Sequence, residues 1–207
     1  YNSSWALLRI PNFKFRPSHN DVFHFDLWYK GQNVIHDAGT FSYNPQKLST
    51  NRTLKSVIYH NTVMFDNHEQ MPVLGRFLLG DWIKPDYISK ITQKKNQIIW
   101  EGSYRDAWKN QHQRKIIHYN NKWIIEDQLK GKFESASIHF NLKEADYKLS
   151  KNTLFGPWGN IVVFGAEEIK LNDSVYSPYY FQFENCKQLF IRPGNKNTVK
   201  TIIELSE

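Results

Sequence analysis

Histidine and aspartate side chains gather in three short stretches in the N-terminal part of this chain, each with residue types that can bind a metal ion or move a proton. The stretches are residues 16–21, 36–43 and 59–66. Each lies at the end of a strand-like segment, where loops present side chains for chemistry. Taken singly, a histidine at a strand end is also typical of a hydrogen-bonded structural residue, and Asp37 before Ala38-Gly39 can cap a turn.

The elements that must position these stretches are β-strands. Alternation of apolar and polar residues at a period of two, rich in β-branched and aromatic types, recurs along the whole chain. It predicts strands over residues 22–29, 33–37, 62–65, 98–104, 113–118, 122–128, 135–142, 161–164, 179–183, 188–192 and 199–205. Turn residues separate them, as in Gly156-Pro157-Trp158-Gly159. No helical pattern persists over three turns, so the sequence predicts an all-β fold, an antiparallel β-sandwich of many short strands.

Length and composition fit one domain over residues 1–207. A chain of 207 residues with 40% hydrophobic and 23% charged residues can bury a core. The single cysteine, Cys186, excludes a disulfide framework and a zinc site made of cysteine pairs. No apolar run is long enough to span a membrane. A chain that opens on Tyr1 without an initiator methionine is expected to be a fragment or a processed product.

The charge balance favours a polyanionic partner. Lysine and arginine total 27 against 20 aspartates and glutamates, a net charge of +7. Such a surplus attracts nucleic acid, acidic lipid or acidic polysaccharide without choosing among them. The cationic residues are scattered, form no basic helix face and carry no nucleic-acid motif, so nucleic acid is not an expected partner.

Taken in order, the three stretches resemble a known family. The matching residues are His19 with Asp21, Asp37-Ala38-Gly39-Thr40-Phe41-Ser42-Tyr43, His60-Asn61-Thr62-Val63, and Asp66 with Gln70. This order is similar to that of the C-terminal β-sandwich domain of heparinase II/III-type polysaccharide lyases. Arg114 and residues 125–131 extend the likeness over most of the chain, and residues 70–77 resemble the branch found with bacterial exopolysaccharide and capsule genes.

The resemblance implies a metal site made by His19, Asp37 and His60. Two imidazoles and one carboxylate suit zinc and leave a fourth position open, and the implied role of the ion is mainly structural, at the floor of a cleft. With a turn at residues 30–32, Asp37 pairs with Phe25, and a straight strand would hold His19 about 20 Å from Asp37. Residues 18–22 are therefore expected to bend back towards Asp37.

The reaction that the resemblance implies is β-elimination on a uronate glycoside. The C5 proton is removed, the neighbouring carboxylate is shielded and the C4 oxygen departs, which requires a general base, a general acid and a stabilising cationic or hydrogen-bonding group. Expected catalytic residues are Tyr43 and Arg52, and expected substrate-binding residues are Arg16, Tyr59, Gln70 and Trp82.

Two departures from the family pattern limit the expected activity. Pro17 stands where lyases of this type commonly carry a further histidine, and nothing in these 207 residues resembles their N-terminal helical toroid. The isolated chain is therefore expected to be inactive, as half of a site completed by an N-terminal helical domain of the same protein. The expected partner is an acidic polysaccharide, and the expected location is periplasmic or secreted in a bacterium.

An interpretation from another class remains open, namely a non-catalytic carbohydrate-binding or assembly module in which the metal site only stabilises the fold. The pattern of residues around the first strand also gives a local prediction. Alternation over residues 22–29 places His24 and Asp26 on the face opposite Phe23, as a pair on the solvent side rather than a second site.

Overall fold

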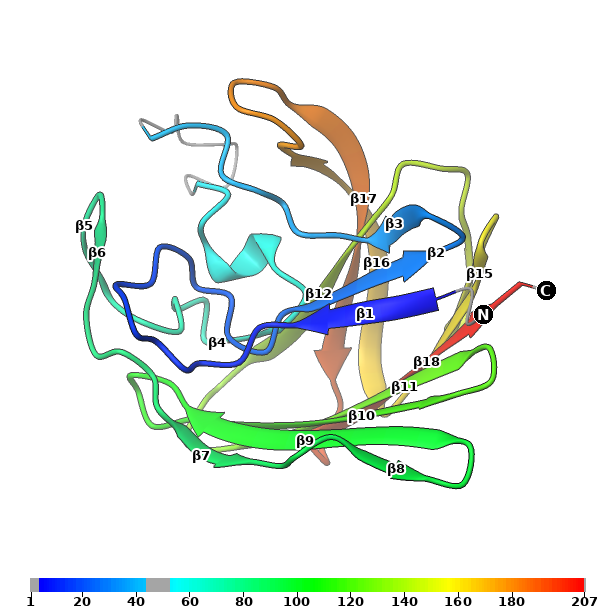
Figure 1. The fold of residues 1–207 in the computed structure, drawn as a ribbon, viewed down its shortest axis with the longest axis horizontal. Coiled ribbons are helices and arrows are strands. Elements are labelled where there is room, and N and C mark those ends of the chain that lie inside the picture. Colours follow the sequence, from blue (N-terminus) through cyan, green and yellow to red (C-terminus); the bar gives the residue numbers. More distant parts are fainter. Residues whose placement is uncertain (1–3, 44–52, 207) are drawn as a thin grey trace.

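The computed structural model describes residues 4–43 and 53–206, and two antiparallel β-sheets dominate this part of the chain (Figure 1). One sheet has the strand order β1 (Ser4–Leu8), β2 (Phe25–Tyr29), β3 (Gln32–Ile35), β12 (Ala136–Leu142), β17 (Glu184–Pro193) and β16 (Ala166–Tyr176), with β4 (Val63–Phe65) paired to β12. The predicted all-β class is confirmed.

The second sheet has the order β13 (Lys148–Ser150), β14 (Thr153–Gly156), β15 (Gly159–Phe164), β18 (Thr198–Leu205), β11 (Lys122–Lys130), β10 (Gln111–Tyr119), β9 (Gln97–Arg105) and β7 (Pro85–Ile88), with β8 (Thr92–Lys94) paired to β9. A short hairpin joins β5 (Val73–Gly75) to β6 (Leu78–Leu79), and the turn η1 (Val57–Tyr59) is a 3-10 helix.

The core lies between the two sheets, and alternation along the strands builds it. Every second residue of β10 is buried, and β11 follows the same pattern as far as Leu129. The core-facing residues of β11 pack against the first sheet, as where Trp123 meets Phe25 edge to face. Each large apolar side chain buried in this way contributes about 1.5–3 kcal/mol.

One predicted strand is wrong, and one long strand escaped prediction. Residues 179–183 are not a strand but lie in the turn between β16 and β17, and the rings of Tyr179 and Phe181 are exposed. Their alternation of aromatic and polar residues reflects a surface loop. By contrast, β16 is an edge strand without a single fully buried residue, so it carries no alternating apolar signal.

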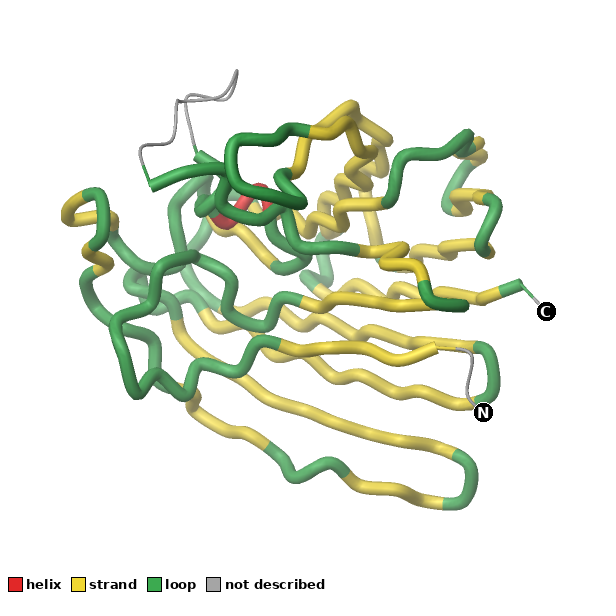
Figure 2. The backbone as a smooth tube through the Cα atoms, turned by 45° about the horizontal axis from the view of Figure 1, so that its top comes forward, coloured by secondary structure: helices red, strands yellow, loops and turns green. Residues whose placement is uncertain are grey.

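Long loops gather at one end of the sandwich (Figures 1 and 2), together with η1 and the β5–β6 hairpin. Backbone hydrogen bonds join them, since Asn20 N donates to Lys55 O at 3.0 Å and Ser177 N donates to Ala38 O at 2.8 Å. All three stretches singled out from the sequence therefore lie on one end of the molecule, each entering it from a different strand.

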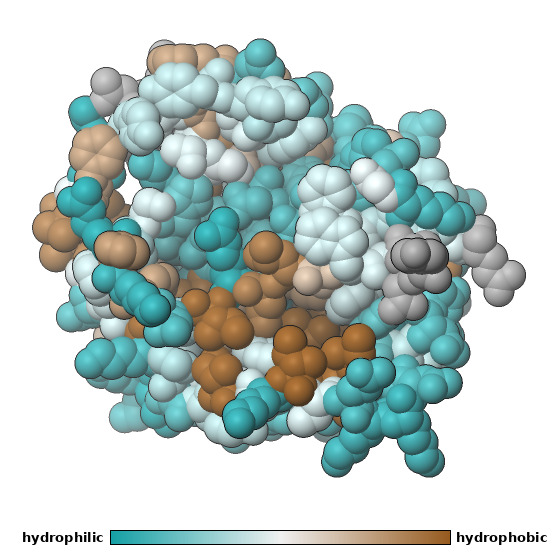
Figure 3. Space-filling model, in the orientation of Figure 1, coloured by the Kyte–Doolittle hydropathy of each residue, from teal (hydrophilic) through white to brown (hydrophobic). Residues whose placement is uncertain are grey.

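A different face, between β1 and β9, is apolar (Figure 3). A groove there is lined by residues that include Trp5, Leu7, Ile10, Ile91 and Ile98. In the described ranges, no helix has the length and apolar character needed to cross a bilayer.

Candidate metal centre and the cleft around it

His19 reaches the centre because the chain before β2 folds back, as expected from the spacing. A turn follows Asp21, with His24 N donating to Asp21 O at 3.0 Å, and Phe23 takes a positive φ of 60°. Directly after His19, Asn20 Oδ1 accepts a hydrogen bond from Met71 N at 2.7 Å. The bend is thus fastened to the rest of the fold and does not depend on His19 itself.

Asp37 follows β3, and its carboxylate is held by the next turn. Its Oδ1 accepts a hydrogen bond from Gly39 N at 2.6 Å. Gly39 has a φ of +73°, and a Cβ there would collide with the carbonyl oxygen of Ser177. Glycine is therefore required by both conformation and space, which explains the Asp-x-Gly pattern.

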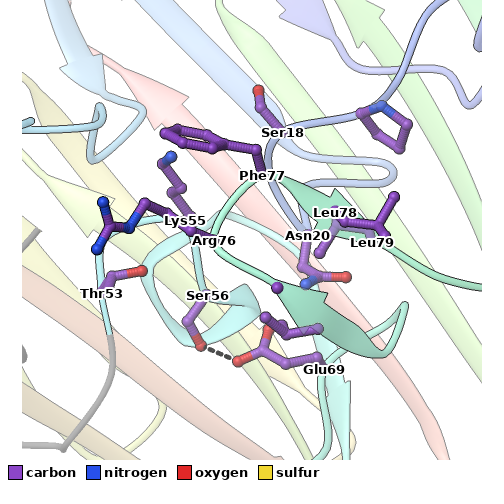
Figure 4. A pocket seen from close by; sticks show the side chains of 13 residues that line it. Ser18, Asn20, Thr53, Lys55, Ser56, Glu69, Arg76, Phe77, Leu78 and Leu79 are labelled. Atoms are coloured by element: carbon purple, nitrogen blue, oxygen red, sulfur yellow. Dashed lines mark hydrogen bonds between the residues drawn. The ribbon is translucent and has the colours of Figure 1, made fainter. Parts of the chain in front are cut away.

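His60 is delivered by η1. The carboxylate of Glu69 accepts hydrogen bonds from Val57 N at 2.9 Å and from the hydroxyl of Ser56, which fixes the start of the turn (Figure 4). His60 N donates to Val57 O at 3.1 Å and closes it. The His60 side chain that leaves this turn is fully buried.

The structure brings His19, Asp37 and His60 together. Each offers one ligand atom, and these three atoms lie within 4.8 Å of one another. The ring centres of His19 and His60 are 5.2 Å apart, and His60 Nδ1 lies 3.5 Å from Asp37 Oδ2. Two imidazoles and one carboxylate at this spacing are a donor set that zinc prefers.

The polar atoms of this cluster fit a cation. Among the described residues, neither ring nitrogen of His60 has a hydrogen-bond partner, and neither has Asp37 Oδ2, although all three atoms are buried. An unpaired buried polar atom costs about 1–3 kcal/mol. A cation that accepts one lone pair from the His60 ring and one from Asp37 Oδ2 would remove most of this cost.

The electrostatics of the cluster couple Asp37 to His60. Burial alone would raise the pKa of Asp37, but the attraction of His60, His24 and His19 outweighs it and holds that pKa well below its ordinary value. Burial likewise opposes the charge on His60, yet Asp37 keeps the pKa of His60 raised. Burial and the nearby His60 lower the pKa of His19 to about 3, so His19 is neutral, and its Nε2 lies 3.0 Å from the hydroxyl of Thr40.

His24 belongs to the cluster, which corrects the expectation that it faces solvent with Asp26. Its side chain is 1% exposed, and its Nε2 lies 3.7 Å from Asp37 Oδ2. Strand β2 begins only at Phe25, so the period-two alternation does not extend back to His24. The segment that follows η1 covers this side chain, because Asn61 N donates a hydrogen bond to His24 Nδ1 at 2.9 Å.

The side chain of Asn61 connects several segments behind the metal cluster through hydrogen bonds, although the sequence predicted no separate role for it. Its Nδ2 donates to Phe25 O at 2.8 Å and to His36 O at 3.1 Å, and its Oδ1 accepts from Asn141 N at 2.6 Å. Because Asn61 follows His60 directly, these bonds fix the histidine to β2, to the residue after β3 and to β12. The one sequence feature that pointed to Asn61 was its place in the His60-Asn61-Thr62-Val63 motif.

Arg114 completes this support from the second sheet. It is fully buried, and its Nη1 donates to Phe23 O at 2.6 Å and to Asn61 O at 2.8 Å. Asp127 neutralises it through two hydrogen bonds. The family-like positions Arg114 and Asp127 therefore support the site from beneath and do not enter the cleft.

Two hollows flank the segment that carries His19. One, of about 350 Å³, is lined by residues from this segment, from residues 53–56 and from the β5–β6 hairpin, including Lys55, Arg76 and Phe77 (Figure 4). The other, of about 370 Å³, is lined by residues 12–19 together with Arg9 and Asp21. Cationic side chains thus line both hollows beside the segment that carries His19.

The expected substrate-contact residues divide between the surface and the interior. Arg16 is exposed in the second hollow, and Tyr43 is 67% exposed, with its ring against Phe77. Trp82 is 42% exposed, but its Nε1 donates to Leu79 O, so its polar edge is already used. Arg52 lies outside the described residues.

Gln70 and Tyr59 are interior residues. Gln70 is 3% exposed, accepts a hydrogen bond from Val22 N at 2.8 Å and donates to the hydroxyl of Tyr104 at 2.7 Å. Tyr59 is 5% exposed and packs with Ala38 and Leu54. Both side chains hold together the loops that carry the ligands, and neither offers surface to a polysaccharide, in contrast to the expectation.

Comparison with known proteins gives a family and a fold. Residues 11–204 match the family described as heparinase II/III-like, C-terminal. Among solved structures, a heparinase III gene product with methylated lysines superposes with a TM-score of 0.79 at 15% identity, over 98% of this chain and 32% of that chain. A heparan sulfate lyase from Pedobacter heparinus gives a TM-score of 0.71 at 19% identity, over 91% and 31%.

These structural neighbours are longer proteins, because this chain spans about a third of their length. A comparison of the sequence with curated proteins gives no match.

Proposed function

Because this chain belongs to the heparinase II/III-like family as its C-terminal domain, we propose that it supplies the β-sandwich half of a lyase for an acidic, uronate-containing polysaccharide. The observation that carries this proposal is the meeting of His19, Asp37 and His60, with two hollows that contain cationic side chains beside the segment of His19. Neighbours with the same fold are described as heparinase III and heparan sulfate lyase, which supports a sugar acid as the substrate class.

In this proposal, His19, Asp37 and His60 hold one divalent metal ion, with zinc favoured by the donor set. When bound, the ion ties together three loops that enter from different strands and adds positive charge to the cleft floor. The unpaired buried atoms of His60 and Asp37 support this assignment. The residues have no cysteine among them, so a site for a softer metal is not favoured.

The cleft is suited to an anionic polymer. Arg16 and Lys14 line the hollow on one side of His19, and Lys55 and Arg76 line the hollow on the other. Two acidic side chains in the hollows are already engaged, since Asp21 faces Arg9 at 3.6 Å and Glu69 fixes η1. A chain of uronates lying across His19 would meet cations on both sides.

The proposed reaction is β-elimination, in which a base takes the C5 proton and an acid protonates the departing C4 oxygen. Tyr43 has an exposed phenol, its ring packs against Phe77 at the border of one hollow, and it is assigned to proton transfer. Arg52 is assigned to the substrate carboxylate. Because Pro17 replaces the further histidine of the family pattern, the remaining proton-transfer group is assigned to the N-terminal helical domain.

Substrate binding tests the proposal directly. We expect this chain to bind heparan sulfate oligosaccharides at low salt, and Arg16→Ala to weaken binding several-fold, because one exposed ionic contact is worth up to about 1 kcal/mol. Lys94→Ala, an exposed cation on β8, is the matched control and should bind as the wild type does. Equal affinity of all three proteins would contradict a cleft at His19.

Activity separates this function from the alternative, a non-catalytic carbohydrate-binding or assembly module, which Pro17 favours. The chain alone should release no unsaturated uronate product, detected by its ultraviolet absorbance. Joined to its N-terminal helical domain, it should release that product, and Tyr43→Phe should abolish the release. Binding without release by the joined protein would establish the module instead.

A further inference from the structure

The ring of His24 is locked in one tautomer by its surroundings. Asn61 N donates a hydrogen bond to His24 Nδ1 at 2.9 Å, so Nδ1 must carry a lone pair. A neutral imidazole then carries its hydrogen on Nε2. Asn61 cannot turn away, because its side chain is bonded to the carbonyls of Phe25 and His36 and its own carbonyl accepts from Arg114.

The Nε2–H of His24 faces the metal-binding carboxylate. His24 Nε2 and Asp37 Oδ2 are 3.7 Å apart, and within the described ranges each is a buried polar atom with no hydrogen-bond partner. His24 Nε2–H is the donor and Asp37 Oδ2 is the acceptor. Moving the two side chains about 0.5 Å closer brings these atoms to hydrogen-bond distance. The other oxygen of Asp37 is already held by Gly39 N at 2.6 Å.

We infer that His24 is a positioning residue for the metal site, donating its Nε2–H to Asp37 and aiming that carboxylate at the ion, and that it is not itself a ligand. Both of its nitrogens are committed, Nδ1 to the backbone of Asn61 and Nε2–H to Asp37. The protein then supplies three ligands, His19, Asp37 and His60, and the coordination sphere keeps a position for water or substrate. This inference rests on the proposed metal site.

Neighbours that orient a metal ligand typically change affinity by about 10- to 100-fold when removed, without changing the number of ions bound. His24→Leu is therefore expected to bind one equivalent of zinc with an affinity about 10- to 100-fold lower than that of the wild type. His24→Gln keeps an N–H donor near the Nε2 position and should recover most of the affinity. His118→Leu, which removes a buried imidazole that stacks on Trp123, should leave the affinity unchanged.

The experiment has two arms on this chain. Nitrogen-15 NMR of the imidazoles reports the tautomer of His24 before and after addition of zinc alone, and competition with a chelator gives the zinc affinity of each variant. An Nε2–H tautomer in both states, with the affinity order wild type, His24→Gln, His24→Leu, is the expected result. Loss of the Nε2 hydrogen on zinc addition would make His24 a ligand and overturn the inference.

An Nδ1–H tautomer in the metal-free chain, or wild-type affinity in His24→Leu, would overturn it as well. Failure of the proposed metal site gives a different result, because the wild type then binds no zinc. The tautomer measured by NMR alone then decides whether His24 donates to Asp37. Because that arm uses the wild-type chain, it does not depend on whether any variant folds.

Discussion

The guanidinium of Arg114 and the carboxylate of Asp127 form a fully buried two-point ion pair, with Nε–Oδ1 at 2.7 Å and Nη2–Oδ2 at 3.1 Å. Asp127 also meets His112 Nε2 at 2.7 Å. The pair sits in the second sheet, yet Arg114 donates to the carbonyls of Phe23 and Asn61 in the loops of the first. The ion pair therefore links the centre of the domain to residues that adjoin His24 and His60.

Replacing Arg114 should be severely destabilising. In Arg114→Leu the carboxylate of Asp127 stays buried without its cationic partner, and two carbonyls lose their donor, so we expect the free energy of unfolding to fall by about 3–5 kcal/mol. Urea denaturation measures it. The exposed pair Arg105–Asp86, at 2.9 Å, is the control, and Arg105→Ala should cost less than about 1 kcal/mol. Similar losses in both variants would contradict the role given to Arg114.

Two glycines with the same backbone conformation separate conformational strain from lack of space. Gly31 has a φ of +75° with nothing near its missing Cβ, whereas Gly39 has a φ of +73° and faces Ser177 O. Gly31→Ala should cost about 1 kcal/mol from conformation alone. Gly39→Ala should cost a further 1–3 kcal/mol or so from the collision. Thermal unfolding compares the two variants, and equal losses would show that Ser177 yields freely.

Asp26 should lower stability at neutral pH. Burial raises the pKa of Asp26 from 3.8 to about 6. Because the folded chain holds this proton more tightly than the unfolded chain, stability is lost as pH rises through about 6. Asp26→Asn, which stays neutral, should gain about 1–2 kcal/mol over the wild type at pH 8 and almost nothing near pH 3; the gain is modest because water still reaches the carboxylate.

Denaturant titrations of the wild type and of Asp26→Asn at the two pH values test this. A gain in Asp26→Asn that is larger at acidic pH would reverse the assigned sign.

The sequence predicted the fold where burial alternates and failed where it does not. Strands β9 to β11 and the turn between Gly156 and Gly159 were predicted within a few residues, because alternating core positions and turn residues coincide there. Strand β16 lies at an edge with no fully buried residue, so its pattern carried no signal. Residues 179–183 alternate, but on an exposed turn.

The candidate site was predictable as a set of ligands but not as a network. His19, Asp37 and His60 could be named because their motifs resemble those of the heparinase II/III-type family, and a shared ligand role for His19 and Asp37 then requires the bend before β2. His24 was expected in solvent because its burial depends on a segment distant in sequence, here the one that contains Asn61. Gln70 was expected at the surface because burial of a polar residue depends on partners distant in sequence, here Val22 and Tyr104.

The metal content of the purified chain tests the central claim most directly. After incubation with zinc and removal of the excess, elemental analysis of the wild type should give about one equivalent per chain, and His60→Ala should retain only traces, because one of three ligands is gone. His68→Ala, which removes an exposed imidazole stacked on Trp108, should keep the full equivalent. Equal trace levels in the wild type and His60→Ala would contradict a metal centre built from His19, Asp37 and His60.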